Sequence, residues 1–429
     1  MPKIICMGRR GVVEVGLFKR YKFGSRVLRM GMRGPDVQAL QEHLRERGYD
    51  IPTEEQHFSY LTREALQQFQ RDYGLTVDGV AGKTVFALLK QERLPITRRI
   101  HSVAPGETIE QIAERYGVGV EAFSTSNRVR KLYPGQRLVF FDREVWAVAE
   151  TPAQARSDLT GVFVPYDLNK IEQSEGIPGF HLENVVPALY TSAEDEVLWI
   201  HHQLCTPFRR RRLAEQAAAL CRGAGGVCFC FTRLSRVDGG RYLALLKRVR
   251  RALLPQQRLM VQLGPGIPRR GFTSGLDFKA LSRVVDRVVV HLPQPAEPGP
   301  VVDRRVVEKQ LWPLLRVINP WQILLRLPVY ALLWNLEDRT APPVQLSHRE
   351  AVTRIYRRST RARQHTEQFY RFVEQGVEYG LGMASREAVS QVAALVNLYN
   401  LAGVALDRLG MEDGRLWQVL RSHFHTSHM

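Results

Sequence analysis

The C-terminal two-thirds of the chain alternates short apolar runs with longer stretches of helical spacing. Each run is short enough for a buried strand, and helical stretches lie between them. Strands that alternate with helices favour a parallel sheet, and roughly 270 residues is a usual size for a (β/α)8 barrel. The pattern therefore predicts a TIM-type α/β barrel over residues 155–429, preceded by a linker at 143–157. The expected strands are residues 159–164, 184–189, 196–201, 226–231, 259–263, 287–292, 323–328 and 402–406.

The N-terminal part of the chain has helical spacing without strands. Val37, Leu40 and Leu44 recur at helical intervals, and Pro35 suits the first turn of the same helix. A second helix is expected from Thr62, which can cap it, and a short third helix follows. Together these patterns predict a multidomain chain that starts with a basic leader at 1–25 and a small three-helix module at 26–92.

Residues 99–146 predict a second small module. A short strand at 100–103 precedes Thr108, which can cap a helix whose apolar face begins at Ile109. Gly117 can end that helix, because glycine adopts the left-handed backbone that follows many helices. A turn and a closing strand complete a βααβ unit.

Both N-terminal modules resemble known families through ordered motifs. The first carries G-x-x-V-x-x-L-Q, F-Q-x-x-x-G-L-x-x-D-G and G-x-T, and it resembles the peptidoglycan-binding-domain-1 family over its whole length. The second carries V-x-P-G-E-T-I, I-A-x-x-Y-G-V and P-G-Q-x-L, and it resembles the LysM domain. These resemblances imply that the partner is peptidoglycan or another N-acetylglucosamine glycan.

The LysM resemblance places the sugar in a shallow groove between two loops. Turn glycines and prolines expose backbone donors and acceptors there, which suit N-acetyl groups, although the same residues also make the turns of the fold. The implied carbohydrate-binding residues are Pro105, Gly106, Glu107, Thr108, Ile109, Tyr133 and Pro134.

Residues 223–232 combine a glycine cluster with alternating bulky and small side chains, which is typical of a strand entering a packed sheet. The layout resembles the fourth barrel strand of family 18 glycoside hydrolases, and other segments of the domain resemble the spore-germination (YaaH-like) type of that family. The family pattern is D-x-x-D-x-D-x-E, in which the Glu is the catalytic acid. The corresponding positions here are Gly225, Cys228, Cys230 and Thr232.

The chemistry that this resemblance implies is missing at three strands. Thr232 cannot protonate a glycosidic oxygen, and a cysteine in an apolar barrel stays a thiol. After the sixth strand the family has the motif M-T-Y-D, whereas residues 291–294 of this chain are His-Leu-Pro-Gln. At the eighth strand the family has a tryptophan on the floor of its site, and this chain has Asp407 at that position. We therefore expect a barrel without the family's catalytic residues and without a cofactor.

Two alternatives stay open. A carboxylate could act as a relocated acid of a cortex-lytic N-acetylglucosaminidase, although no spacing singles out a pair; the candidates are Asp167, Glu194, Asp195, Glu196 and Glu297. The second alternative is a metal-dependent hydrolase. Cys228 and Cys230 share one face of a strand, and two thiols together with imidazoles could bind zinc. The imidazoles would come from His201 and His291; without a metal, the thiols fill space left by the missing carboxylates.

The formal net charge of +18 favours polyanionic surroundings. No nucleic-acid-binding motif accompanies this charge, so we expect glycan partners and no nucleic acid. Basic clusters at 208–212 and 354–363 are candidate contacts for peptidoglycan carboxylates or a spore coat protein.

Five cysteines, sparse and odd in number, argue against a disulfide framework. The first residues hold an apolar run of only four, too short for a secretory signal, and no segment approaches the roughly 20 apolar residues that span a bilayer. We expect synthesis in the cytoplasm of a sporulating mother cell, without a membrane span, and association with the spore coat or cortex.

Overall fold

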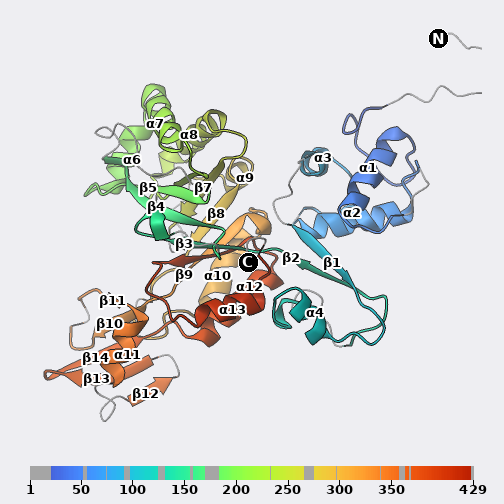
Figure 1. The fold of residues 1–429 in the computed structure, drawn as a ribbon. Coiled ribbons are helices and arrows are strands. Elements are labelled where there is room, and N and C mark those ends of the chain that lie inside the picture. Colours follow the sequence, from blue (N-terminus) through green and yellow to red (C-terminus); the bar gives the residue numbers. More distant parts are fainter. Residues whose placement is uncertain are drawn as a thin grey trace, which may run out of the picture. The chain divides into compact units, whose positions relative to one another are not determined.

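The structure is a computed structural model of one chain that divides into two compact units, residues 1–94 and 95–429 (Figure 1). The two units are described separately. The structure describes residues 21–51, 56–73, 75–90, 97–123, 131–154, 158–169, 183–231, 233–264, 275–295, 297–338, 340–356, 363–366 and 369–426.

The described part of the first unit contains three helices, as predicted: α1 (Pro35–Glu46), α2 (Tyr60–Asp72) and α3 (Lys83–Leu89). Pro35 occupies the first turn of α1. The start of α2 differs from the prediction, because Ser59 and not Thr62 is the N-cap, and the Ser59 side chain accepts a hydrogen bond from the Thr62 backbone N–H. Thr62 is instead fully buried, and its hydroxyl accepts a hydrogen bond from Gln41 of α1 at 2.9 Å.

The second unit begins with the predicted LysM-like elements, β1 (Arg98–Ser102), α4 (Ile109–Arg115) and β2 (Arg137–Phe141), with β1 and β2 antiparallel. Thr108 caps α4 in a reciprocal capping box with Gln111. Gly117, at φ 64°, follows the end of α4 as expected. Residues 121–123 form a further helical turn, and the remainder of the expected second helix, residues 124–130, lies outside the described residues.

Eight parallel strands close a barrel in the order β15-β3-β4-β5-β6-β7-β8-β9, which confirms the predicted fold class. Helices between the strands cover the barrel, and none of the helices in the described part of the chain is long and apolar enough to cross a bilayer. The strands are β3 (Glu144–Val148), β4 (Gly161–Asp167), β5 (Val185–Tyr190), β6 (Gly226–Phe229), β7 (Arg258–Leu263), β8 (Arg287–His291), β9 (Ile323–Pro328) and β15 (Gly403–Asp407). The covering helices are α6 (Glu196–Leu204), α7 (Pro207–Leu220), α8 (Gly239–Ala252), α9 (Phe278–Ser282), α10 (Arg304–Leu314), α12 (Arg386–Leu398) and α13 (Leu416–His423).

Two strand predictions are wrong. The expected linker at 143–157 contributes the first barrel strand, β3, which pairs with β15 and β4 only two residues after β2 ends. The expected third strand at 196–201 is helix α6: Asp195 caps it, and Ile200 and Leu204 bury one face. Four consecutive apolar residues suggested a strand there, but a short apolar run cannot by itself distinguish a strand from a buried helix.

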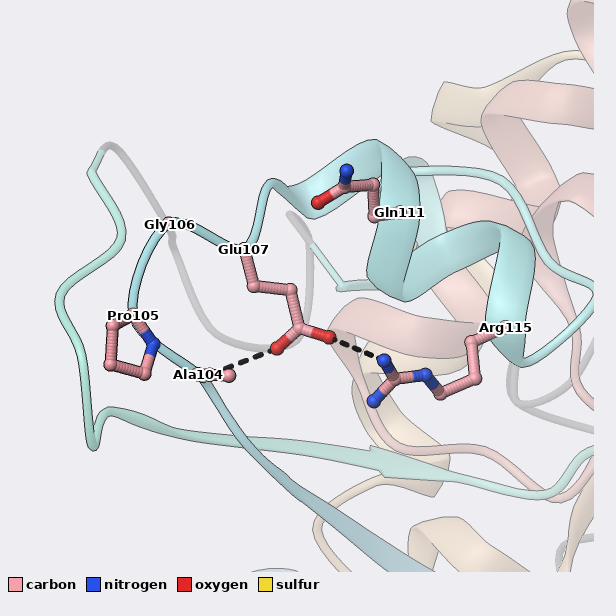
Figure 2. Close-up of a pocket in the computed structure, with 6 residues that line it drawn as sticks. All are labelled: Ala104, Pro105, Gly106, Glu107, Gln111 and Arg115. Carbon is pink, nitrogen blue, oxygen red and sulfur yellow. Dashed lines mark hydrogen bonds and ion pairs between the residues drawn. The ribbon is translucent and has the colours of Figure 1, made fainter.

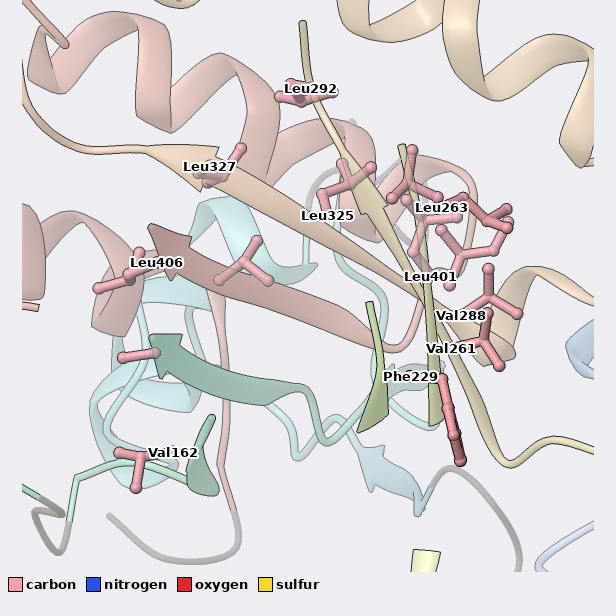
Figure 3. Close-up of a cluster of buried hydrophobic side chains, with 14 of the residues drawn as sticks. Val162, Phe229, Val261, Leu263, Val288, Leu292, Leu325, Leu327, Leu401 and Leu406 are labelled. Atoms are coloured by element: carbon pink, nitrogen blue, oxygen red, sulfur yellow. The ribbon is translucent and has the colours of Figure 1, made fainter. Parts of the chain in front are cut away.

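The barrel strands bury side chains on both faces. Outward-facing residues such as Phe229, Val261, Val288 and Leu325 pack in one large cluster with side chains of the surrounding helices (Figure 3). Between them in sequence, inward-facing residues fill the barrel interior with a middle layer in which Trp146 stacks on Phe163 at 4.8 Å. The middle layer contains Trp146, Phe163, Val186, Ala188, Cys228, Met260, Val289, Leu324 and Ala405.

Charged side chains close the N-terminal end of the barrel, which we name the lower layer (Glu144, Arg258 and Arg287). The Arg287 Nη2 donates to Glu144 Oε1 at 2.6 Å, and the Arg258 Nη1 donates to the same oxygen at 2.9 Å. Burial opposes ionisation of Glu144, but the two guanidinium charges outweigh it and lower the pKa of that carboxyl to about 2. This layer fixes β3 against β7 and β8 across the barrel.

An additional α+β subdomain, which the sequence patterns did not predict, is inserted between β9 and α12. Its antiparallel sheet has the order β11-β10-β14-β13-β12, and it stands apart from the barrel strands in Figure 1. Its elements are β10 (Ala331–Asn335), β11 (Val344–Leu346), α11 (His348–Tyr356), β12 (Arg363–Thr366), β13 (Phe369–Glu374) and β14 (Val377–Gly382).

Candidate functional site

A shallow hollow of about 440 Å³ lies beside α4 in the LysM-like part of the second unit. Figure 2 shows the loop before α4 on one side of it and the exposed side of the helix on the other. The lining residues are Ala104, Pro105, Gly106, Glu107, Gln111 and Arg115. Gly106 has φ 79°, a left-handed backbone that L side chains rarely adopt, so glycine suits this turn.

The Glu107 carboxylate organises the hollow. Its Oε2 accepts hydrogen bonds from the Ala104 backbone N–H at 2.9 Å and from His101 Nε2 at 2.8 Å, while Arg115 Nη2 lies 3.0 Å from Oε1. The bond from the Ala104 N–H and that from His101 lower the pKa of Glu107. These contacts hold the loop against α4 and leave the Arg115 side chain 61% exposed at the rim.

Three of the seven sequence-predicted sugar-binding residues line this hollow: Pro105, Gly106 and Glu107. Thr108 caps α4, and Ile109 packs against the small apolar core. Tyr133 is 60% exposed and Pro134 is exposed, both outside the lining of the hollow.

Gln111 and Arg115 also line the hollow, although the sequence motifs did not predict them as site residues. They follow Glu107 by four and eight residues, and Gln111 and Arg115 share one face of α4. This spacing could have indicated from the sequence that both side chains lie on the side of α4 that faces Glu107.

The four positions of the missing family 18 motif are only partly described, because Thr232 lies outside the described residues. At Gly225 the chain is too crowded for any side chain, since a Cβ there would lie 2.0 Å from the Glu183 carbonyl oxygen. Cys228 is buried in the middle layer, and Cys230 packs against it from above. Their Sγ atoms are 3.8 Å apart.

Above the middle layer, at the C-terminal ends of the strands, polar side chains face inward; we name them the upper layer (Cys230, Gln262, His291, Arg326 and Asp407). Each lies two positions after a middle-layer residue and therefore points to the same face. Arg326 donates to Gln262 Oε1 and to Asp407 Oδ1, each at 2.5 Å, and His291 Nε2 lies 3.7 Å from Asp407 Oδ2.

The charge state of Asp407 follows from these contacts. Burial works to raise the pKa of this carboxyl, but the contact with His291 and the charge of Arg326 outweigh it, so that the pKa lies below the usual value. A carboxylate held ionised in this way cannot donate the proton that glycoside hydrolysis needs near neutral pH.

The candidate zinc ligands are not brought together. His201 lies on helix α6 and not at the end of a barrel strand, and its Nδ1 lies 2.9 Å from Asp238 Oδ2. His291 contacts Asp407. Within the described ranges, no group of three or more His, Cys, Asp or Glu side chains is placed to hold a metal ion.

Two of the candidate relocated acids have local structural partners. Asp167, at the end of β4, accepts hydrogen bonds from the Ser192 hydroxyl at 2.5 Å and from the Asn169 backbone N–H at 3.1 Å. Asp195 is the N-cap of α6. These contacts tie each carboxylate to the loop between a strand and its helix.

The basic cluster at 208–212 lies in the first turns of α7, where Phe208 is 73% exposed and Arg211 pairs with Glu215 at 2.8 Å. Much of the second cluster, residues 357–362, lies outside the described residues.

Comparison with known proteins identifies the two small domains. Residues 33–89 match the family described as "Putative peptidoglycan binding domain", and residues 101–141 match the LysM domain. A spore cortex-lytic enzyme of Oceanobacillus iheyensis is 36% identical over 66 residues, which cover 15% of this chain and 24% of that enzyme. The chain spans only 16% to 27% of the length of the curated relatives that it matches.

Solved structures are similar over much more of the chain. The crystal structure of the Bacillus cereus spore cortex-lytic enzyme SleL has a TM-score of 0.59 and 16% identity, covering 94% of this chain and 98% of that chain. A chitinase from Chromobacterium violaceum has a TM-score of 0.54 and 18% identity, covering 66% of this chain and 98% of that one. At these identities the likeness shows the fold alone: the barrel is a closed eight-stranded parallel barrel like those of the two similar structures, as the sequence predicted.

Proposed function

We propose that this chain is a peptidoglycan-binding protein whose barrel does not hydrolyse glycans. The observation that carries the binding proposal is the hollow at Pro105, Gly106 and Glu107, within the segment that matches the LysM domain. Exposed backbone groups of the Pro105–Gly106 turn offer donors and acceptors to N-acetyl and hydroxyl groups of a glycan. In this proposal the loop that carries Tyr133 and Pro134 forms the outer side of the same groove.

The barrel chemistry supports binding without hydrolysis. Crowding at Gly225 leaves no room for a carboxylate, and two thiols take the next two motif positions. Asp407 is held ionised by Arg326 and His291. Hydrolysis by the family 18 route needs an acid that keeps its proton near neutral pH, and these residues do not supply one.

The proposal extends to the place of action. The relative from Oceanobacillus iheyensis and the similar structure from Bacillus cereus are both spore cortex-lytic enzymes, which supports a role at the bacterial spore. The exposed basic start of α7 is a candidate contact for wall carboxylates or for a spore coat protein.

A matched pair of variants of the full chain tests the binding site. Glu107→Gln removes the charge that orders the hollow, whereas Glu110→Gln changes an exposed residue in the first turn of α4. We expect Glu107→Gln to reduce sedimentation with purified peptidoglycan about tenfold, and Glu110→Gln to bind like the original chain. Equal binding by both variants would exclude the hollow as the glycan site.

A further inference from the structure

Two thiols meet inside the barrel, one in the middle layer and one in the upper layer, where the family 18 pattern has carboxylates. The Sγ atoms of Cys228 and Cys230 are 3.8 Å apart, and the structure holds both residues as free cysteines. We propose that Cys228 and Cys230 form a redox-active dithiol that a hydroperoxide converts into an intramolecular disulfide.

The backbone brings the two sulfurs to one face. Cys228 lies within β6 and Cys230 follows directly after the strand, so their side chains both point into the barrel. Phe229, between them in sequence, points to the opposite face and packs edge-on against Tyr242 of helix α8. Bond formation requires the sulfurs to approach from 3.8 Å to about 2.05 Å.

The two thiols differ in exposure, which assigns them different roles. Cys228 is 1% exposed, whereas Cys230 is only partly buried and lies nearer the open end of the barrel. The hydrogen bond with Cys228 lowers the pKa of the Cys230 thiol; burial works against this and the charge of Arg326 adds to it. Burial raises the pKa of Cys228 well above its usual value. Cys230 is therefore the attacking thiolate and Cys228 the resolving thiol.

The reaction balances with a hydroperoxide as oxidant. The Cys230 thiolate attacks one peroxide oxygen, the O–O bond breaks, and a sulfenic acid forms while hydroxide (or alkoxide) leaves and takes up a proton. The Cys228 sulfur then attacks the sulfenic sulfur; its proton and the sulfenic hydroxyl leave as water, and the S–S bond forms. Two thiols have lost two electrons to the peroxide, and a dithiol reductant reverses the step.

Arg326 favours this chemistry over metal binding. Its guanidinium lies within electrostatic reach of both sulfurs, and its buried Nε has no hydrogen-bond partner among the residues that the structure describes. A fixed positive charge stabilises a thiolate but opposes a metal cation at the same place. No third His, Cys, Asp or Glu ligand joins the two sulfurs in the part of the chain that the structure describes.

The chain contains a matched control thiol. Cys221 is fully buried, its Sγ donates to the Ala217 carbonyl at 2.9 Å, and burial raises its pKa to about 12. In the part of the chain that the structure describes this thiol has no cysteine partner, and it should stay reduced under mild peroxide.

The test uses the reduced full chain, treated with hydrogen peroxide, alkylated, digested and analysed by mass spectrometry. We expect the peptide with Cys228 and Cys230 to lose two hydrogens and to regain them with dithiothreitol, while Cys221 remains alkylatable. In Cys228→Ser, dimedone should trap a sulfenic acid on Cys230. In Cys230→Ser, oxidation at Cys228 should be slower by about tenfold or more, with circular dichroism confirming that both variants fold.

Two results would overturn the proposal. One is alkylation of Cys228 and Cys230 after peroxide treatment to the same extent as Cys221. The other is stoichiometric retention of zinc in equilibrium dialysis, lost in either serine variant, which would assign the pair to a metal.

Discussion

Asp407 of β15 accepts a hydrogen bond from Arg326 of β9 at 2.5 Å, inside the end of the barrel where family 18 enzymes act. Arg326 also holds Gln262, and His291 faces the other oxygen of Asp407. Polar side chains from four strands therefore form hydrogen bonds and ion pairs with one another. Cys230, at one of the four positions of the family 18 motif, lies in the same layer as this network.

Asp407→Asn tests whether this network is structural. The change leaves the Arg326 charge without its anion in a buried site, so the free energy of unfolding should fall by about 3 kcal/mol. Urea denaturation measures it. Glu215→Gln, in an exposed pair with Arg211, is the control and should change stability by less than about 1 kcal/mol. Equal effects of the two variants would show that Asp407 is not held as described.

The lower layer predicts how stability depends on pH. The pKa of Glu144 is lowered to about 2 in the folded chain, against about 4.3 when unfolded. A lowered pKa gives stability that is fully present above the unfolded value and is lost as pH falls from about 4.5 through about 2. Glu144→Gln should therefore lower stability at neutral pH and weaken the acid-induced loss in urea titrations. If the free energy of unfolding fell at acid pH as steeply in Glu144→Gln as in the original chain, the role of Glu144 would be contradicted.

Gly225 tests whether the first aspartate of the family 18 motif could be restored by substitution at this position. A Cβ at Gly225 would meet the Glu183 carbonyl at 2.0 Å, whereas one at Gly240 would meet nothing within 4 Å. Gly225→Ala should cost several kcal/mol of unfolding free energy or prevent folding, and Gly240→Ala should be neutral or stabilising by up to about 1 kcal/mol. Thermal unfolding of both variants measures this; a tolerated Gly225→Ala would remove the steric argument.

The sequence predicted the elements whose signals are local. Turn glycines, Pro35 and the Thr108 cap mark the two small domains, and the repeated apolar runs mark most barrel strands. β3 was missed because a five-residue strand directly after the LysM-like part carries no turn signal of its own. Helix α6 was mistaken for a strand because its apolar run is continuous.

The candidate sites were predictable only in part. The Pro105–Glu107 turn could be found from its motif, since its residues are adjacent in sequence. The pairing of Arg326 with Asp407 depends on the stagger of two barrel strands far apart in sequence, and spacing alone does not give it. Alternation implied that Cys228 and Cys230 share one face, but it implied neither the 3.8 Å between their sulfurs nor the electrostatic effect of Arg326 on them.

One measurement tests the central claim most directly: the purified full chain is incubated with spore cortex peptidoglycan, and bound protein and released reducing ends are scored in the same tube. The account predicts sedimentation with the glycan, reduced in Glu107→Gln, and no reducing ends above a protein-free control. Reducing ends that rise with protein concentration and persist after chelation of metals would contradict it, because the barrel would then hold a working acid.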